Sequence, residues 1–450
     1  MNGNLQPRAQ WSSMTSYLLV TTGAVVGLGN IIQFPFYVYQ FGGLFILLYL
    51  LCELFICIPI FLAEILIGRS GKQNPVGSFS LLSREAGASP YWRYMGWLCF
   101  IILFLGLADY AVSVSFPMAY FVDVFKMVTT TGAHPVLLQP EHAAITQHFS
   151  ILEGYFLIFL LATMLVVLRG INRGLETISR VTVPLYFIIL LGLAIYSCSV
   201  GDVGYALRGL FTLSSQASFF TVFVAALAYA FFKLNVGMGS MIVYGSYLPY
   251  SVPIGRSTLL IVCFDAVISL LSYFVIYPLY VPSHETAAFA HSFRETFFFF
   301  SETPNGEVMA LLFFLAAAIA AWTPAIAMAE SATVTLIERF DISRRRAAWV
   351  IFAGVFLVGT LIVLSYHLWE TVFILHRWSV LTFLHSMMSI ILIPLSALLI
   401  SVFAGWVLRR GMTDNELNFK PELYSLWRFL VRYIAPVCVV ITAIILMYPV

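Results

Sequence analysis

Long apolar stretches recur along the whole of this 450-residue chain and constrain its fold more than any other feature. A stretch of about 20 apolar residues is long enough to cross a lipid bilayer as a helix. We expect eleven such spans, at about residues 14–40, 43–67, 94–127, 150–168, 178–200, 218–247, 257–281, 307–337, 347–366, 378–408 and 429–449. Because the connections are short, the sequence predicts a single all-α integral membrane domain over residues 1–450.

The composition excludes several other classes of protein. Hydrophobic residues make up 61% of the chain and charged residues only 10%, whereas a soluble domain carries about 25% charged residues. A net charge of +2 does not favour a nucleic-acid partner. The chain has no HExxH, GxSxG or phosphate-loop motif, so it does not resemble an enzyme. His134, His142 and His148 share one loop, but their irregular spacing is more typical of solvated histidines than of a metal site.

The basic residues predict the orientation of the chain in a membrane. With a cytoplasmic N-terminus, most of the 23 lysines and arginines fall on the cytoplasmic side, and Lys233 lies within the membrane. After eleven crossings the C-terminus is expected outside. The polar leader does not resemble a cleavable signal peptide. The chain also lacks an Asn-x-Ser/Thr acceptor, which fits a prokaryotic inner membrane.

Two of the predicted spans contain paired glycines at mid-membrane. The first carries GLGN at residues 27–30, and the sixth carries KLNVGMG at residues 233–239. Each glycine weakens a helix by about 1 kcal/mol relative to alanine, and broken backbone at membrane depth is tolerated where it lines a cavity. The breaks lie five spans apart, so we expect two five-helix repeats, over about 14–200 and 218–408, and an extra helix at 429–449. Close helix packing through small residues is the alternative explanation.

The motifs around these breaks resemble those of the neurotransmitter:sodium symporter family. Residues 27–35 (GLGNIIQFP) resemble the family's opening, and they are followed by Gly42-Gly43 and by Gly68-Arg69. Residues 244–247 (YGSY) resemble the inner end of its sixth helix, and residues 432–436 (RYIAP) resemble its eleventh helix. This resemblance implies two inverted repeats with broken helices 1 and 6, and uptake of an amino acid or amine coupled to sodium at two sites.

The resemblance implies that the second sodium site is largely kept. Its matching ligands are backbone carbonyls of Gly23, Val26 and Ala320, and the hydroxyl of Thr323. Pro324 stands where the family has a further side-chain oxygen, so we expect at most one bound sodium, held by four protein oxygens. In the alternative interpretation, Thr323 and Pro324 only kink the eighth helix, and the hydroxyl of Thr323 satisfies a freed carbonyl.

The resemblance implies that the first sodium site is changed at two of its positions. Asn30 is kept, but Lys233 replaces a hydroxyl residue and Asp265 replaces an asparagine. A lone lysine at the bilayer centre costs at least about 2.5–3.5 kcal/mol, which a nearby carboxylate would largely offset. We expect the ammonium to stand where the family holds a sodium ion, balanced by Asp265. Asp109 is the alternative partner, and a purely structural ion pair is the alternative role.

The resemblance also implies the substrate walls and the gates. Tyr110 and Phe232 are expected to form an outer aromatic lid. The wall residues expected around the substrate are Val25, Leu28, Gly29, Gly106, Tyr110, Phe232, Lys233, Asn235, Met238, Pro324 and Met328. Gln33 replaces the outer gate arginine, whereas the inner gate pair is kept as Arg8 and Glu338. The chloride-linked positions are mixed, since Tyr49 and Ser269 fit the family pattern and Tyr229 and Lys233 do not.

The sequence therefore predicts a secondary transporter that imports a small amino acid or related zwitterion by alternating access. Its partners are this small molecule and the lipid bilayer, and Na⁺ is the candidate coupling ion, with no other cofactor. Two alternatives stay open. One is sodium-independent or proton-coupled transport in which Lys233 and Asp265 exchange the proton, and the other is a non-transporting sensor. The substrate, the chloride dependence and the oligomeric state do not follow from the sequence.

Overall fold

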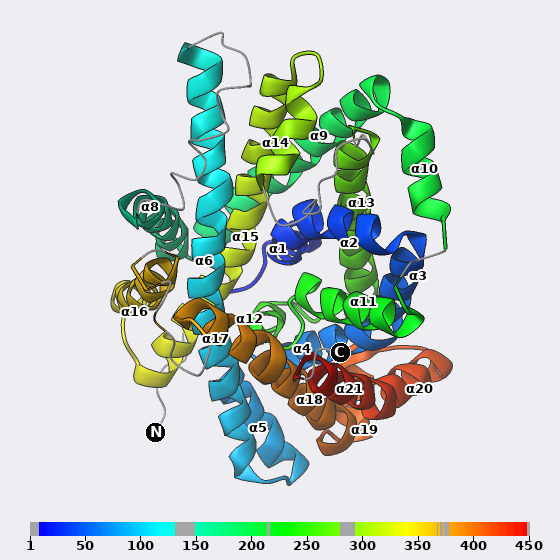
Figure 1. Cartoon of the computed structure of the whole chain (residues 1–450). Helices are drawn as coiled ribbons and strands as arrows, with labels where there is room; N and C mark the ends of the chain where they lie inside the picture. Colours follow the sequence, from blue (N-terminus) through cyan, green and yellow to red (C-terminus); the bar gives the residue numbers. More distant parts are fainter. Residues whose placement is uncertain are drawn as a thin grey trace.

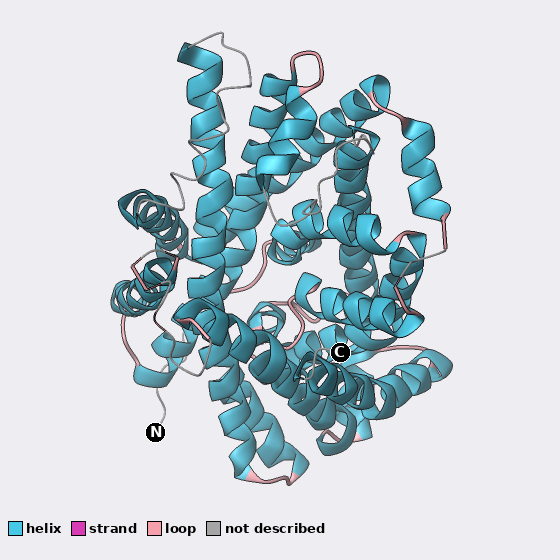
Figure 2. Cartoon of the chain, viewed as in Figure 1, coloured by secondary structure: helices cyan, strands magenta, loops and turns pink. Residues whose placement is uncertain are grey.

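The computed structural model describes residues 9–130, 149–213, 217–279, 293–366, 368–369, 372 and 378–447. Arg8 and the three loop histidines lie outside these residues. The described part of the chain is built of helices joined by short loops (Figure 2). The α-helices of the first half are α1 (Met14–Val25), α2 (Phe34–Phe41), α3 (Gly43–Cys52), α4 (Ile58–Gly71), α5 (Pro75–Ala86), α6 (Arg93–Thr130), α8 (Phe149–Leu168), α9 (Thr177–Val200) and α10 (Val203–Phe211).

The second half continues the helical architecture. Its α-helices are α11 (Phe219–Lys233), α12 (Ser240–Ser246), α13 (Ile254–Ile276), α14 (Phe293–Ser301), α15 (Gly306–Phe340), α16 (Arg344–Ser365), α17 (Val380–Ser386), α18 (Ile393–Val402), α19 (Arg410–Leu417), α20 (Pro421–Phe429) and α21 (Ala435–Met447). Short π-helical segments connect several of them, among which η1 (Gly29–Gln33), η2 (Glu53–Cys57), η7 (Met387–Leu392) and η9 (Leu430–Ile434) matter below.

Apolar helices of membrane-spanning length account for most of the predicted spans. Nine helices in the described residues are long and apolar enough to cross a membrane, and the bent pair Met14–Val25 and Gly29–Phe41 makes a tenth. Each of these lies over one of the predicted spans. The remaining predicted span, the sixth at 218–247, corresponds to α11 and α12, and the 15 residues of α11 are too few to cross a bilayer alone. The eleven-helix count therefore rests on joining these two helices into one broken span.

The first span is interrupted where the sequence places its paired glycines. α1 ends at Val25, Val26 is extended with φ −76° and ψ 121°, and the helical path resumes at Gly29 after a 60° bend. A Cβ atom on Gly27 would lie 2.7 Å from the Tyr110 hydroxyl of α6. A side chain at this position would therefore force the Tyr110 ring to shift, and the glycine lets α6 approach the break closely.

The sixth span is interrupted between Lys233 and Ser240. Asn235, Gly237 and Gly239 have φ angles of 52°, 85° and 83°, a left-handed backbone that ends α11 and re-aims the chain into α12. The backbone N–H of Gly237 donates a hydrogen bond of 2.6 Å to the buried Glu64 carboxylate of α4. A carboxylate on a neighbouring helix thus satisfies a backbone group that the break has freed.

Longer helices surround the two broken spans. α1 contacts α9, α13 and α15, whereas α11 contacts α3 and α12 contacts α4 and α15. Figure 1 shows α1 and α2 together with α11 and α12 at the middle of the molecule, beside the long α6, α13 and α15. The fold therefore places both breaks in the interior of the helical bundle.

Candidate functional site

A buried ionic cluster lies where α11 ends. Lys233 is the last residue of α11, and its side chain is inaccessible to solvent. Its Nζ lies 2.6 Å from Oδ2 of Asp265 on α13 and 3.9 Å from Oε1 of Glu53 on η2, and it donates a hydrogen bond to the Tyr49 hydroxyl of α3. The ammonium thus joins α11 to the consecutive elements α3 and η2 and to α13.

Asp265 is therefore the partner of Lys233, and Asp109 is not. Asp109 on α6 instead pairs with His385 on α17, with 3.2 Å between its Oδ2 and the ring Nδ1. The sequence alone left these two partners for Lys233 open. His385 was not among the residues that the sequence analysis singled out.

Polar side chains connect the cluster to both breaks. The amide nitrogen of Asn30 donates hydrogen bonds of 2.6 Å to Oδ1 of Asp265 and 3.0 Å to the Ser269 hydroxyl. Its oxygen accepts a 3.1 Å bond from the backbone N–H of Gly27. From the other break, Asn235 donates a 2.6 Å bond to the carbonyl of Ala24 at the end of α1. The first and sixth spans are thus joined at their interruptions.

Aromatic rings pack against the ionic cluster, with the Lys233 Nζ 4.3 Å from the ring centroid of Tyr49 and 6.0 Å from that of Tyr229. The ring centroids of Phe34, Tyr49 and Tyr229 lie 5.3–6.1 Å from one another. The Tyr229 hydroxyl donates a 3.3 Å hydrogen bond to the carbonyl of Gly29. Because little water reaches such a site, the charges interact more strongly than they would at the surface.

Glu53 is the cluster member that the sequence analysis missed. Its side chain is 2% exposed, and its Oε1 atom has no hydrogen-bond partner among the described residues. When all three groups are ionised, the two carboxylates exceed the single ammonium by one negative charge. An acidic residue inside an apolar span is itself a signal of function, and Glu53, one of two glutamates in the span 43–67, could have been found in this way.

Gly23 and Thr323, two predicted ligands of the second sodium site, lie close together where α1 packs against α15. A Cβ atom on Gly23 would lie 3.1 Å from Cβ and 3.2 Å from Oγ1 of Thr323, so the two helices approach closely there. Pro324 has no N–H to offer the carbonyl of Ala320, and the Thr323 hydroxyl donates a 3.2 Å bond to that carbonyl. The hydrogen bond expected in the alternative interpretation, in which the Thr323 hydroxyl satisfies a freed carbonyl, is therefore present in the structure. The Thr323 hydroxyl oxygen and the Ala320 carbonyl oxygen are also hard ligands of the kind that Na⁺ prefers.

Several predicted substrate residues converge beside the first break. The Tyr110 hydroxyl and Cγ of Pro324 lie 2.7 and 3.3 Å from the position of a Cβ atom on Gly27. A Cβ atom on Gly106 would lie 4.0 Å from the sulfur of Met328. Val25 and Met238 are buried, and Leu28 and Gly29 are partly exposed.

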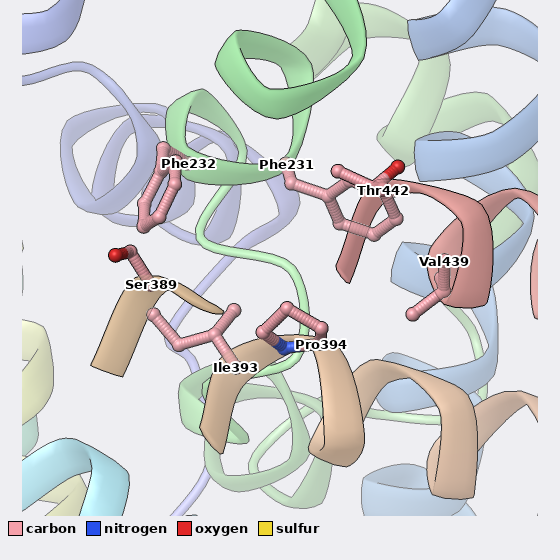
Figure 3. A pocket seen from close by; sticks show the side chains of 7 residues that line it. All are labelled: Phe231, Phe232, Ser389, Ile393, Pro394, Val439 and Thr442. Atoms are coloured by element: carbon pink, nitrogen blue, oxygen red, sulfur yellow. The ribbon is translucent and has the colours of Figure 1, made fainter. Parts of the chain in front are cut away.

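Phe232 is directed to a different space. It lines a cavity of about 10 Å³ with Phe231, Ser389 and Ile393 (Figure 3). A cavity of that size holds about one water molecule. This small space is therefore not a substrate site, and the lid role of Phe232 remains a prediction.

The end of α1 away from the breaks is anchored to α12. The indole nitrogen of Trp11 donates a 3.0 Å hydrogen bond to the carbonyl of Tyr244, and the ring is 3% exposed. Oε2 of Glu338, the predicted inner gate acid, accepts bonds of 2.7 and 2.8 Å from the backbone and side-chain nitrogens of Asn74. Its predicted partner, Arg8, lies outside the described residues. Gln33, the predicted outer gate position, ends η1 and is exposed.

Comparisons with known proteins agree with this arrangement. The model of the sodium:neurotransmitter symporter family matches residues 8–134 and 142–449. The uncharacterized sodium-dependent transporter YhdH of Bacillus subtilis is 27% identical, over 97% of both chains. An uncharacterized sodium-dependent transporter of Haemophilus influenzae is also 27% identical, over 98% of both chains. The crystal structure of MhsT in complex with L-phenylalanine superposes with a TM-score of 0.82 at 26% identity, over 97% of this chain and 99% of that one.

Proposed function

The chain belongs to the sodium:neurotransmitter symporter family, and on that premise we propose that it imports a small amino acid or related zwitterion by alternating access. One observation carries the proposal: two interrupted membrane spans are joined at their breaks by Asn30, Asn235 and the Lys233 cluster. Interrupted helices at the bilayer midplane are where secondary transporters bind their substrates and ions. The similarity to MhsT, whose structure holds L-phenylalanine, supports an amino acid as the substrate.

The proposed topology follows the sequence analysis. It has eleven spans, two inverted repeats at about 14–200 and 218–408, an extra helix at 429–449, a cytoplasmic N-terminus and an external C-terminus. A prokaryotic inner membrane is the proposed location. In support, α1 and α11 end at matching breaks, one in each proposed repeat.

The substrate carboxylate is proposed to bind at the first break. The outer half of the first span begins at Gly29, so its N-terminal end faces the break, and a helix N-terminus attracts anions. Tyr110 lies against Gly27 at the same place. Lys233, held in position by Asp265, is proposed to supply the positive charge that a sodium ion supplies elsewhere in the family. The remaining wall residues named from the sequence complete the proposed pocket.

We propose that a single sodium ion couples transport, at the second site. Its ligands would be the carbonyls of Gly23, Val26 and Ala320 and the hydroxyl of Thr323. Two observations support this set of ligands. α1 approaches α15 closely at Gly23, and the carbonyl of Ala320 lacks its helical N–H partner because Pro324 has no N–H to donate.

Thermal unfolding of the purified protein in sodium and in potassium tests the sodium site. Wild type should unfold at a higher temperature in sodium, and Thr323→Val should lose that difference. Thr163→Val is a matched control, because Thr163 is equally buried and donates to a carbonyl of its own helix, α8, but lies away from the site. If Thr323→Val keeps the full sodium effect, the proposed ligand set is wrong.

Proton coupling is the second candidate, and Glu53 is the observation that favours it. A buried cluster with one excess negative charge has a place for one exchangeable proton. Uptake into proteoliposomes separates the two candidates. If sodium couples transport, a sodium gradient should drive uptake. If a proton couples it, a pH gradient in choline buffer should drive uptake, and Glu53→Gln should no longer respond to that gradient. Saturable binding without uptake under either gradient would instead indicate a sensor.

A further inference from the structure

A large groove lies on the outer surface of the bundle, away from both breaks. Its volume is about 650 Å³, which is within the range of about 300–1,000 Å³ that is typical of small-molecule sites. Residues of η2, α4, α13 and α20 form its walls, including Leu54, Leu62, Leu259, Leu426 and Trp427. Trp427 is held in place by a 3.1 Å hydrogen bond from its indole nitrogen to the carbonyl of Pro59.

Most of this groove is apolar and faces outward. Leu54, Leu259 and Leu426 are 49%, 57% and 48% exposed. In a bilayer these side chains meet lipid acyl chains rather than water, so the walls need no protein partner to stay covered. Leu54 directly follows Glu53, so whatever lies in the groove touches the element that carries the third member of the ionic cluster.

One end of the groove is cationic. Arg256, in the first turn of α13, and Lys420, the residue before α20, both line it. Both residues are exposed, and neither side chain makes a hydrogen bond or an ion pair within the described part of the chain. Glu422, the acidic residue in the first turn of α20, is not among the lining residues. The two cations are therefore available to one anionic group.

A buried donor lies at the same end. The Thr258 side chain is 1% exposed and lines the groove, and its hydroxyl has no hydrogen-bond partner among the described residues. A buried hydroxyl without a partner costs about 1–3 kcal/mol, which an external acceptor oxygen would offset. The Thr258 hydroxyl is therefore a second feature, independent of the two cations, that favours binding of an oxygen-rich group at this end of the groove.

We propose that this groove binds a phospholipid with an anionic headgroup. The acyl chains would lie along the leucines and Trp427, and the phosphate would lie between Arg256 and Lys420 within reach of Thr258. Basic pockets between membrane helices are typical sites for anionic headgroups. A free phosphate would leave the apolar walls without a role. By the positive-inside rule, both cations belong to the cytoplasmic side, so the lipid would come from the inner leaflet.

Native mass spectrometry of the full-length protein in detergent tests this proposal. The probes are phosphatidylglycerol and phosphatidylcholine with identical acyl chains. Two basic residues near the membrane surface should give phosphatidylglycerol about a 30-fold preference. The double variant Arg256→Gln, Lys420→Gln should bind both lipids equally. Leu259→Trp, which fills the groove, should weaken both.

A matched control is the double variant Arg345→Gln, Arg346→Gln, which removes two exposed cations at the start of α16, outside the groove. It should keep the full preference. Four outcomes would overturn the proposal: no preference in wild type, equal loss in the control, binding of inorganic phosphate as tight as that of the lipid, or a dimer that disappears in Leu259→Trp. Size-exclusion profiles establish that each variant is folded, and no result depends on transport.

Discussion

Replacing Lys233 by methionine removes the only cation of the buried cluster while keeping the length of the side chain. At an effective dielectric constant of about 20, two unit charges 2.6 Å apart attract by about 6 kcal/mol, and two charges 3.9 Å apart attract by about 4 kcal/mol. These gross terms are opposed by the cost of desolvating each ion. After the substitution, Asp265 and Glu53 stay buried without a counter-charge. Removing one partner of a buried ion pair typically costs about 3–5 kcal/mol.

Variants of the other two members of the cluster should form a graded series of stability with Lys233→Met. Asp265→Asn leaves Lys233 balanced by Glu53 at the longer distance, so it should cost less than Lys233→Met. Glu53→Gln leaves one ammonium and one carboxylate 2.6 Å apart and removes the excess negative charge, so it should cost least. The apparent unfolding temperature in detergent, followed by intrinsic fluorescence, should therefore fall most in Lys233→Met, less in Asp265→Asn and least in Glu53→Gln.

Two comparisons make this series decisive. Lys126→Met removes a lysine whose side chain is 67% exposed, and it should leave the unfolding temperature unchanged. Lys233→Met combined with Asp265→Asn should unfold at a higher temperature than Lys233→Met alone, because one stranded carboxylate has been neutralised. The reasoning is refuted if Lys233→Met unfolds at the wild-type temperature, or if Glu53→Gln is the most damaging of the three.

Three further predictions concern the surroundings of the breaks. Gly27→Ala should weaken amino-acid binding in a thermal-shift titration, because its Cβ would lie 2.7 Å from the Tyr110 hydroxyl, and adding Tyr110→Phe should restore part of it by making room. Asp109→Asn and His385→Ala should reduce uptake into proteoliposomes to the same level, and the double variant should go no lower, since the two residues form one pair. Trp11→Ala should lower the unfolding temperature by loosening α1 from α12, whereas Trp11→Phe, which keeps the ring but not the hydrogen bond, should lower it less.

The breaks could be predicted from sequence because their cause is local. Paired glycines beside a polar residue are unfavourable in any regular membrane helix, whatever surrounds them. The choice of partner for Lys233 could not be predicted, since it depends on how α6 and α13 are rotated about their axes. Asp109 and Asp265 both lie in the middle of an apolar span, and only the packed structure shows that His385 takes the first and Lys233 the second.

Glu64 shows a different limit of sequence reasoning. It lies in the predicted span 43–67, but nothing in its neighbourhood suggests that its carboxylate accepts the backbone N–H of Gly237, 173 residues away. A buried carboxylate without such a partner would be costly. Its pairing follows from the break itself, because a left-handed backbone at Gly237 turns an N–H away from the helix. The break could be predicted from the sequence, but the carboxylate that accepts its freed N–H could not.

The ionic cluster also limits what family membership says about the coupling ion. A sodium ion and an ammonium carry the same charge, so the proposed replacement of the first sodium ion by Lys233 would leave the charge of that site unchanged. The same proposal has two further consequences for the charge. Asp265 replaces a neutral amide and cancels that charge, and Glu53 then adds one negative charge at 3.9 Å from the ammonium. Relative to a site with one sodium ion and neutral ligands, the cluster has changed from +1 to −1 when all of its groups are ionised. A cluster of that charge attracts one proton or one further cation, so we expect the coupling ion to depend on Glu53 as much as on the proposed second sodium site.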